Sequence, residues 1–209
     1  MELRVNDLLK INSVDDLFGD LKDIPWIDKA VKRAPFVVVR RSPIINDIVP
    51  VGIRGENRSQ RVAASILYSN IIEIITPEQL VEGKLWRNNK HISNTKMLKA
   101  LEDLDTIFKS YSIVWGPTGS VGFELTSGVE TVTASSDLDI VARTPKFLPI
   151  NIAKDIIKTI FKIPVKIDIQ LETSKGSIAL AEYARGDGKV LLRTFNGPKL
   201  VENPWSEDE

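Results

Sequence analysis

The chain has 209 residues, of which 43% are hydrophobic, and its 28 basic residues balance its 28 acidic residues. This composition is typical of a globular protein, and zero net charge argues against a nucleic-acid or anionic-membrane partner. The sequence contains no cysteine and a single histidine, His91, which excludes disulfides, thiolate nucleophiles and sites built from several histidines. Chemistry that uses carboxylates, alone or with a hard cation, stays open.

The first residues, MELRVNDLLKINSVDD, contain acids where a signal peptide needs a basic start and an apolar core. The apolar runs along the chain are only a few residues long, whereas about 20 are needed to span a bilayer. We therefore expect a cytoplasmic protein that is not bound to a membrane.

In chain order, the first part of the sequence mixes short helices and strands. We expect helical or turn segments over 3–11 and 14–18, a helix over 26–33, and strands over 36–41 and 48–53. Pro50 predicts that the strand over 48–53 lies at an edge or contains a bulge. Residues 60–67 fit a helix or a strand. Thr76, Pro77 and Gln79 predict a helix start, with Thr76 as the N-cap residue.

The second part begins after a polar stretch at 87–94, RNNKHISN. We expect a domain boundary there, between an N-terminal α+β domain at 1–92, which would recognise substrate or partner, and a catalytic domain at 93–209. The predicted elements are a helix over 94–108, a strand over 112–115, a tight turn over 116–120, a strand over 137–142, a helix over 151–161, and strands over 165–171, 178–184 and 190–194. This order predicts an α+β fold class, with a small mixed sheet and flanking helices.

Three features of the second part carry candidate chemistry. Gly119 and Ser120 follow a predicted strand, and a turn of small residues lets backbone N–H groups approach phosphate oxygens. Asp137 and Asp139 share one strand face about 6.6 Å apart, a spacing that a hard divalent cation could bridge. Asp168 joins this pair if its strand lies beside 137–142. Each feature also has a simpler interpretation, as an ordinary turn or as solvated acids on an exposed face.

The order of strand, Gly-Ser turn, Asp-x-Asp strand, helix and Asp-containing strand resembles the polymerase-β-like nucleotidyltransferases. The resemblance implies that Gly119 and Ser120 bind the β- and γ-phosphates of a donor. It also implies that Asp137, Asp139 and Asp168 are catalytic and bind Mg²⁺, with Mn²⁺ as an alternative. The 16 residues between Ser120 and Asp137 slightly exceed the usual spacing, and we expect less of the usual helix in this stretch.

Longer stretches give a closer resemblance over nearly the whole chain. The segments GPTGSVGFELTSG at 116–128 and SSDLDIVAR at 135–143 are similar to those of the phosphoribosyl-dephospho-CoA transferases, the holo-acyl carrier protein synthases of malonate decarboxylase. This resemblance implies transfer from 2′-(5″-triphosphoribosyl)-3′-dephospho-CoA to a serine of the apo acyl carrier protein subunit, with pyrophosphate as the leaving group. Asp168 would then be a metal ligand or accept the proton of the serine.

A second cluster of charge lies in the first part, where Arg54, Arg58 and Arg61 occur in the stretch GIRGENRSQR. Arginine side chains suit phosphates and carboxylates, so this cluster, with Arg40 and Arg41, could bind donor phosphates or an acidic carrier protein. It fits equally well a solvated basic loop with Glu56 as the partner.

Two other functions stay open at this point. One is a Mg²⁺-dependent nucleotidyltransferase of the same fold that uses ATP or a similar donor on a protein or small molecule. The other is a non-catalytic binding module, in which the acids are merely surface charges. Arg143 and Arg193 are further candidates for donor contacts, and we expect a structural or solvent-facing role for His91.

Overall fold

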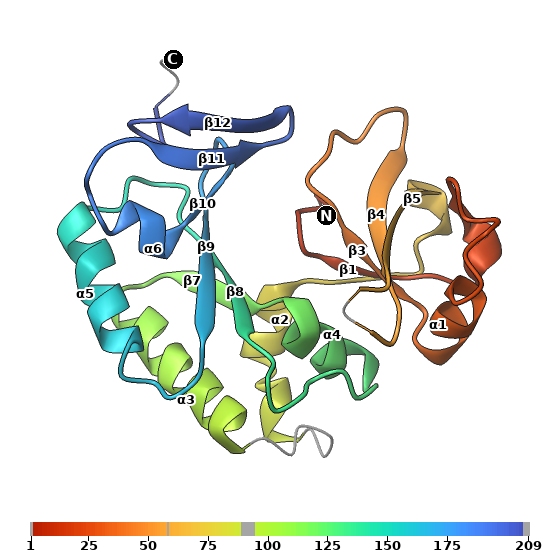
Figure 1. Ribbon diagram of the computed structural model, residues 1–209, viewed down its shortest axis with the longest axis horizontal. Helices are drawn as coiled ribbons and strands as arrows, with labels where there is room; N and C mark the ends of the chain where they lie inside the picture. Colours follow the sequence, from red (N-terminus) through yellow and green to blue (C-terminus); the bar gives the residue numbers. More distant parts are fainter. Residues whose placement is uncertain (1, 58, 89–94, 207–209) are drawn as a thin grey trace.

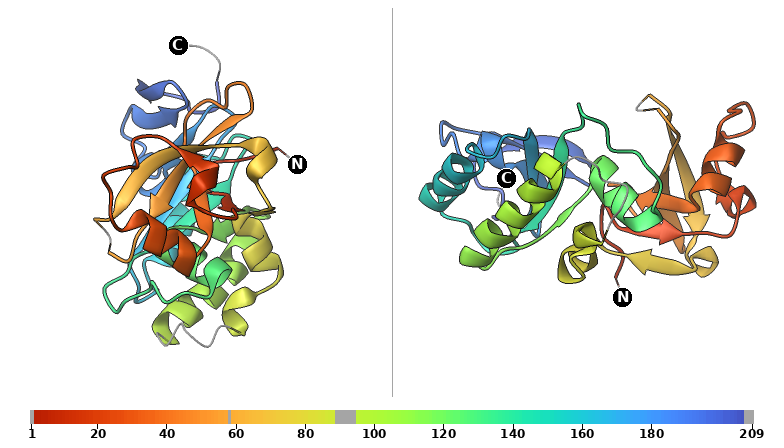
Figure 2. Two further views of the ribbon diagram at one scale, coloured as in Figure 1. Left: turned by 90° about the vertical axis from the view of Figure 1, so that its right-hand side faces the viewer. Right: turned by 90° about the horizontal axis from the view of Figure 1, so that it is seen from below.

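The computed structural model describes residues 2–57, 59–88 and 95–206, which form two six-stranded sheets (Figure 1). The two sheets lie side by side, with helices α2 (Pro77–Glu82) and α4 (Gly119–Ser127) between them (Figures 1 and 2). The fold class is α+β, as the sequence predicted. No helix among the described residues is both long enough and apolar enough to pass through a membrane.

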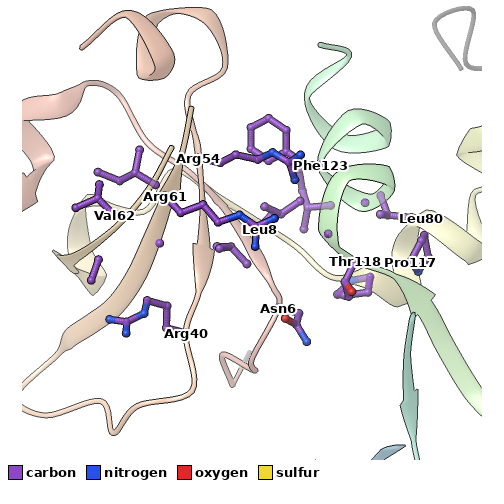
Figure 3. Close-up of a pocket in the computed structure, with 18 residues that line it drawn as sticks. Asn6, Leu8, Arg40, Arg54, Arg61, Val62, Leu80, Pro117, Thr118 and Phe123 are labelled. Carbon is purple, nitrogen blue, oxygen red and sulfur yellow. The ribbon is translucent and has the colours of Figure 1, made fainter. Parts of the chain in front are cut away.

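The first sheet is entirely antiparallel, in the order β2-β5-β4-β3-β1-β6. Its strands are β1 (Leu8–Lys10), β2 (Leu17–Phe18), β3 (Phe36–Val39), β4 (Ile48–Arg54), β5 (Arg61–Leu67) and β6 (Glu73–Ile75). Helix α1 (Ile27–Arg33) packs on one face, where alternate strand residues such as Val37 and Val51 form the core. Short 3-10 helices, η1 (Val14–Asp16) and η2 (Tyr68–Asn70), connect the strands. The other face of this sheet is turned toward α4 (Figure 3).

The structure corrects two expectations for the first part of the chain and resolves the alternative that was open for a third segment. Residues 3–11 contain strand β1 rather than a helix, because their apolar residues pair with β3 and β6 on both sides. Pro50 lies in β4, which is a central strand and not an edge. A central position is possible there because β3 ends at Val39, and Pro50 uses only its carbonyl, which accepts the N–H of Arg40 at 2.9 Å. Within the stretch 60–67, which fitted a helix or a strand, residues Arg61–Leu67 form a strand, β5.

The second sheet has the order β12-β11-β10-β9-β8-β7, and only β8 and β9 run parallel. Its strands are β7 (Val114–Pro117), β8 (Leu138–Arg143), β9 (Ile167–Glu172), β10 (Ser177–Ala179), β11 (Val190–Thr194) and β12 (Gly197–Val201). Helix α5 (Ile150–Ile160) connects β8 to β9, as a parallel pair requires. Helices α3 (Thr95–Ser110) and α5 share one hydrophobic core with the buried face of this sheet.

The structure confirms the two long amphipathic helices and the capped start of α2, where Thr76 and Gln79 form a capping box. The predicted strand over 178–184 is wrong in its second half. After β10, residues Leu180–Tyr183 turn into a short helix, α6, because both Leu180 and Tyr183 are buried against the second core. The domain boundary predicted between residues 92 and 93 lies outside the described residues. Leu80 of α2 and Trp86 of the 3-10 helix η3 (Leu85–Arg87) belong to the second core.

Two ion pairs of low exposure lie where the parts of the fold meet, one between the two sheets and one between the second sheet and α2. Arg41, just after β3, binds Glu172 at the end of β9 through two hydrogen bonds of 2.7 and 2.6 Å. Arg143, at the end of β8, donates from its Nε to Glu78 of α2 at 2.6 Å. Asp7 is fully buried beside this second pair and accepts the backbone N–H of Arg4 at 2.8 Å. The contact between the sheets is therefore held by charged groups shielded from water.

Burial raises the pKa of Asp7 to about 6 from its ordinary value of 3.8, although the Arg4 N–H and the Arg143 charge act in the opposite direction. The folded state thus holds this proton more tightly than the unfolded state does. As the pH rises from 4 to 6, the unfolded chain ionises first, and the free energy of unfolding should fall by up to about 3 kcal/mol. We expect Asp7→Asn to remove this loss.

Urea unfolding of the wild type and of Asp7→Asn between pH 4 and 8 tests this expectation. The difference between the two unfolding free energies should shift in favour of the variant as the pH rises, and level off above pH 6. A difference that does not change with pH would contradict the assigned burial effect.

Candidate active site

Gly119 and Ser120 lie at the start of a helix rather than in a simple turn. Helix α4 spans Gly119–Ser127 and follows β7 after one residue, Thr118. The expectation of less helix between Ser120 and Asp137 therefore fails for residues 121–127, which lie in α4. Residues 121–125 are all buried, so this helix lacks the apolar and polar periodicity by which an amphipathic helix is recognised. The first N–H groups of a helix have no partner within it and attract anions, which suits the predicted phosphate contact.

The carboxylate of Asp139 lies directly against Gly119. A Cβ atom on Gly119 would overlap this carboxylate, and Gly119 has a φ of +58°, a conformation that side chains disfavour. The N–H of Thr118 donates to the carbonyl oxygen of Asp139 at 2.8 Å. The start of α4 is thus fixed against β8 at the position of this acid.

Asp168 lies beside Asp139 on the neighbouring strand. Strands β8 and β9 are parallel, and Asp139 and Asp168 are partners in their register. We expected Asp168 to join Asp137 and Asp139 if its strand lay beside residues 137–142, and the structure shows that it does. Asp168 is exposed, whereas Leu138 and Ile169 point into the core on the other face.

Asp137 has a partner that the sequence analysis did not identify. Its Oδ2 atom accepts a hydrogen bond from Lys166 Nζ at 2.6 Å, across the same strand pair. Within the part of the chain that the structure describes, no three acidic or histidine side chains are gathered as a metal site would need. The joint metal role of Asp137, Asp139 and Asp168 stays a prediction. The sequence did contain one indication that Lys166 lies near the acids, because it stands two residues before Asp168 and so shares its strand face.

The segment between α4 and β8 is held by a buried glutamate, Glu124. Its Oε2 atom accepts the N–H groups of Thr131 and Val132, each at 2.6 Å, and the Glu124 side chain is fully buried. The Thr131 hydroxyl donates to the carbonyl oxygen of Ser120 at 2.9 Å. Sequence reasoning missed this role, although an acid inside the otherwise apolar run of 121–125 was a signal for it. Glu124 thus positions the segment that leads to Asp137.

Arg54 and Arg61 bring positive charge to this group of acids from the first sheet. They are direct register partners on β4 and β5. Both line a cavity of about 240 Å³ that Ser120, Asp137 and Asp139 also line. Further hydroxyl and polar groups of that cavity come from Asn57, Thr131, Thr133, Ser135 and Ser136. Arg54 and Arg61 of the first sheet thus share one cleft with Asp137 and Asp139, and Glu56 in the loop between β4 and β5 adds a third acid to its lining.

The other basic candidates have different surroundings. Arg40 lines a second, larger cavity next to the first, together with Arg54 and Arg61 (Figure 3). Arg41 is bound to Glu172, as described above, and Arg193 donates to the side chain of Gln170 at 2.6 Å. Glu56, the acid considered as a partner for the basic loop, forms ion pairs with Lys29 and Arg33. Arg58 and His91 lie outside the described residues.

The start of α4, the carboxylates of Asp137 and Asp139, and two arginines thus line one cleft, and Asp168 lies next to Asp139 on the neighbouring strand. These are the features of an enzyme site for a phosphorylated substrate. Comparison with known proteins narrows this class to a particular family of transferases.

The family description "Phosphoribosyl-dephospho-CoA transferase MdcG N-terminal domain" matches residues 4–77, and the corresponding "C-terminal domain" matches residues 84–204. The chain therefore belongs to the phosphoribosyl-dephospho-CoA transferase family. No solved structure matched the chain.

Several curated relatives carry the name phosphoribosyl-dephospho-CoA transferase. A relative from Pseudomonas syringae pv. tomato is 38% identical over 86% of this chain and 83% of its own length. A relative from Pseudomonas putida is 37% identical over 97% of this chain and 95% of its own length. A relative from Klebsiella pneumoniae is 33% identical over 99% of this chain and 98% of its own length. The ranges matched by the family, 4–77 and 84–204, thus cover both sheets and the part of the chain that forms the cleft.

Proposed function

We propose that the protein transfers the phosphoribosyl-dephospho-CoA group from 2′-(5″-triphosphoribosyl)-3′-dephospho-CoA to a serine of the apo acyl carrier protein subunit of malonate decarboxylase, releasing pyrophosphate. The names of the relatives support the transferred group, and the sequence resemblance supports the acceptor and the leaving group. The observation that carries the proposed chemistry is the position of Asp139, between Gly119 at the start of α4 and Asp168 on the adjacent strand.

Asp139 and Asp168 would hold a magnesium ion together with the phosphates of the donor, because magnesium commonly uses only one or two protein carboxylates beside substrate phosphates. Asp139 and Asp168 offer oxygen atoms from neighbouring register positions, and carboxylate oxygens are the ligands that hard divalent cations prefer. Asp137 would complete the set by exchanging its contact with Lys166 for the ion. Magnesium bound there supplies charge neutralisation for the triphosphate and makes the α-phosphorus more electrophilic.

The remaining roles belong to groups of the chain itself. The N–H groups at Gly119 and Ser120, with Arg54 and Arg61, would bind the β- and γ-phosphates and stabilise their charge as they leave. The serine oxygen forms a bond to the α-phosphorus while the bond from that phosphorus to the bridging oxygen breaks, and pyrophosphate departs. Asp168 would offer one carboxylate oxygen to the ion and accept the serine proton on the other, since its side chain is exposed to solvent.

Mass spectrometry of the apo acyl carrier protein tests the proposal after incubation with the enzyme, Mg²⁺ and the triphosphoribosyl donor. We expect a mass gain of one phosphoribosyl-dephospho-CoA group and one pyrophosphate released for each carrier protein modified. A carrier protein with alanine at the acceptor serine should gain nothing. Modification with ATP but not with the triphosphoribosyl donor would instead identify a different nucleotidyltransferase, and no modification with either donor would refute the proposed reaction.

A further inference from the structure

The larger of the two cavities lies between the first sheet and helices α2 and α4, and it has a volume of about 390 Å³ (Figure 3). This lies within the range of about 300–1,000 Å³ that small-molecule sites occupy. On the side of the first sheet, Val38, Gly52 and Ala63 are register neighbours across β3, β4 and β5. The small side chains of this row leave the sheet face hollow at this point.

The facing wall is also apolar. It is formed by Leu80 of α2, Pro117 at the end of β7 and Phe123 of α4. In Figure 3, Phe123 extends from α4 toward Arg54, and Leu80 and Pro117 lie on the side of the cavity away from the strands of the first sheet. The middle of the cavity is therefore suited to a planar or apolar group.

Positive charge surrounds this apolar middle. Three arginines line the cavity, and none of the described residues that line it is acidic. Arg54 and Arg61 stand directly opposite each other in an antiparallel pair, so their two positive charges lie close together in the wall of the cavity. Arg40 lies on a different side of the cavity from Arg54 (Figure 3). The cavity thus offers two separate places for anionic groups.

We propose that this cavity binds the dephospho-CoA part of the donor, an inference that rests on the proposed function. The adenine nucleoside of dephospho-CoA occupies the apolar middle. The added ribose triphosphate extends past Arg54 and Arg61 toward Asp139, since both arginines also line the smaller cavity that contains this acid. The 5′-diphosphate, which carries the pantetheine arm, lies against Arg40. A nucleoside with phosphates on both sides therefore matches an apolar cavity that has the Arg54 and Arg61 pair at one place and Arg40 at another.

Calorimetric binding of 3′-dephospho-CoA, which lacks the triphosphoribosyl group, tests this inference without any transfer reaction. We expect the wild type to bind this compound and Ala63→Leu to weaken the affinity about tenfold or more, because the added atoms fill the cavity. Ala63 is exposed in the cavity wall, so the change does not disturb a core. Ala181→Leu, the same replacement at an exposed position of α6 away from the cavity, should bind like the wild type.

A second variant keeps the test decisive if Ala63→Leu is unstable. Arg40→Gln removes one charge from an exposed side chain and should also weaken dephospho-CoA binding about tenfold. In the transfer assay, both variants should raise the KM for the donor more than they lower kcat. Dephospho-CoA should also inhibit the wild type competitively with the donor.

The possible failures can be told apart. If the wild type transfers the group but neither binds dephospho-CoA nor is inhibited by it, the cavity assignment is wrong and the proposed function stands. The same conclusion follows if both variants bind dephospho-CoA as tightly as the wild type does. If the wild type binds dephospho-CoA in this cavity but modifies no carrier protein, the cavity assignment stands and the proposed reaction is wrong.

Discussion

Replacement of Asp139 by asparagine should reduce transfer to the carrier protein by about a thousandfold or more at saturating Mg²⁺. Asp139 contacts Gly119 at the start of α4 and lies next to Asp168, so its charge stands at the centre of the proposed site. The amide is nearly the same size but has no negative charge to hold a cation. Initial rates of carrier-protein modification, followed by mass spectrometry, measure this effect.

Asp155→Asn is the matched control, because Asp155 is an exposed aspartate on α5, on the opposite side of the second sheet. It should transfer like the wild type, and both variants should keep the wild-type melting temperature within a few degrees. A near-normal rate for Asp139→Asn would exclude this carboxylate from the reaction, and with it the assignment of the metal site.

Gly119→Ala should reduce kcat by about a hundredfold or more, because a 1 Å misplacement in an active site can have an effect of this size. The added methyl group would overlap the Asp139 carboxylate and must displace either this acid or the start of α4. The variant also places a side chain at a φ of +58°, which lowers the free energy of unfolding by about 1–2 kcal/mol. The measurements are steady-state kinetics with the donor and urea unfolding.

Gly128 provides a control that separates backbone strain from contact. It ends the same helix with a φ of +69°, but a Cβ atom there would meet nothing within 4 Å. Gly128→Ala should therefore lose stability to a similar degree and keep its transfer activity. Equal losses of activity in the two variants would mean that strain in α4, rather than the contact with Asp139, explains the effect at Gly119.

The sequence predicted best the elements that have one apolar face. Helices α3 and α5 pack a single side on the second sheet, so their apolar residues recur every three or four positions. Strand β9 alternates for the same reason, with Ile169 in the core and Asp168 exposed. Helix α4 is buried over most of its surface and shows no such pattern. The short helix α6 also shows no helical pattern, and its residues belong to a stretch, 178–184, that the sequence predicted to be a strand.

The candidate site was predictable as a set of residue types but not as an arrangement. Alternation placed Asp137 and Asp139 on one face, yet the contact of Asp137 with Lys166 depends on the register of β8 and β9, which local sequence does not reveal. Likewise, the position of Arg54 and Arg61 opposite these acids depends on how the two sheets pack. That packing rests on contacts such as Arg41–Glu172, between residues 131 positions apart in the chain.

The division of the cleft between two sheets has a consequence for how the protein can change. Asp137, Asp139 and Asp168 lie in or next to β8 and β9, whereas the hollow row and the three arginines lie in or next to β3, β4 and β5. Under the proposed assignments, the reacting groups and the groups that select the donor are encoded in separate stretches of sequence. Substitutions in the first sheet could then redirect the enzyme to a different nucleotide while the catalytic strands stay the same. Under these assignments, the preference for a donor can change in evolution without a change in the type of reaction.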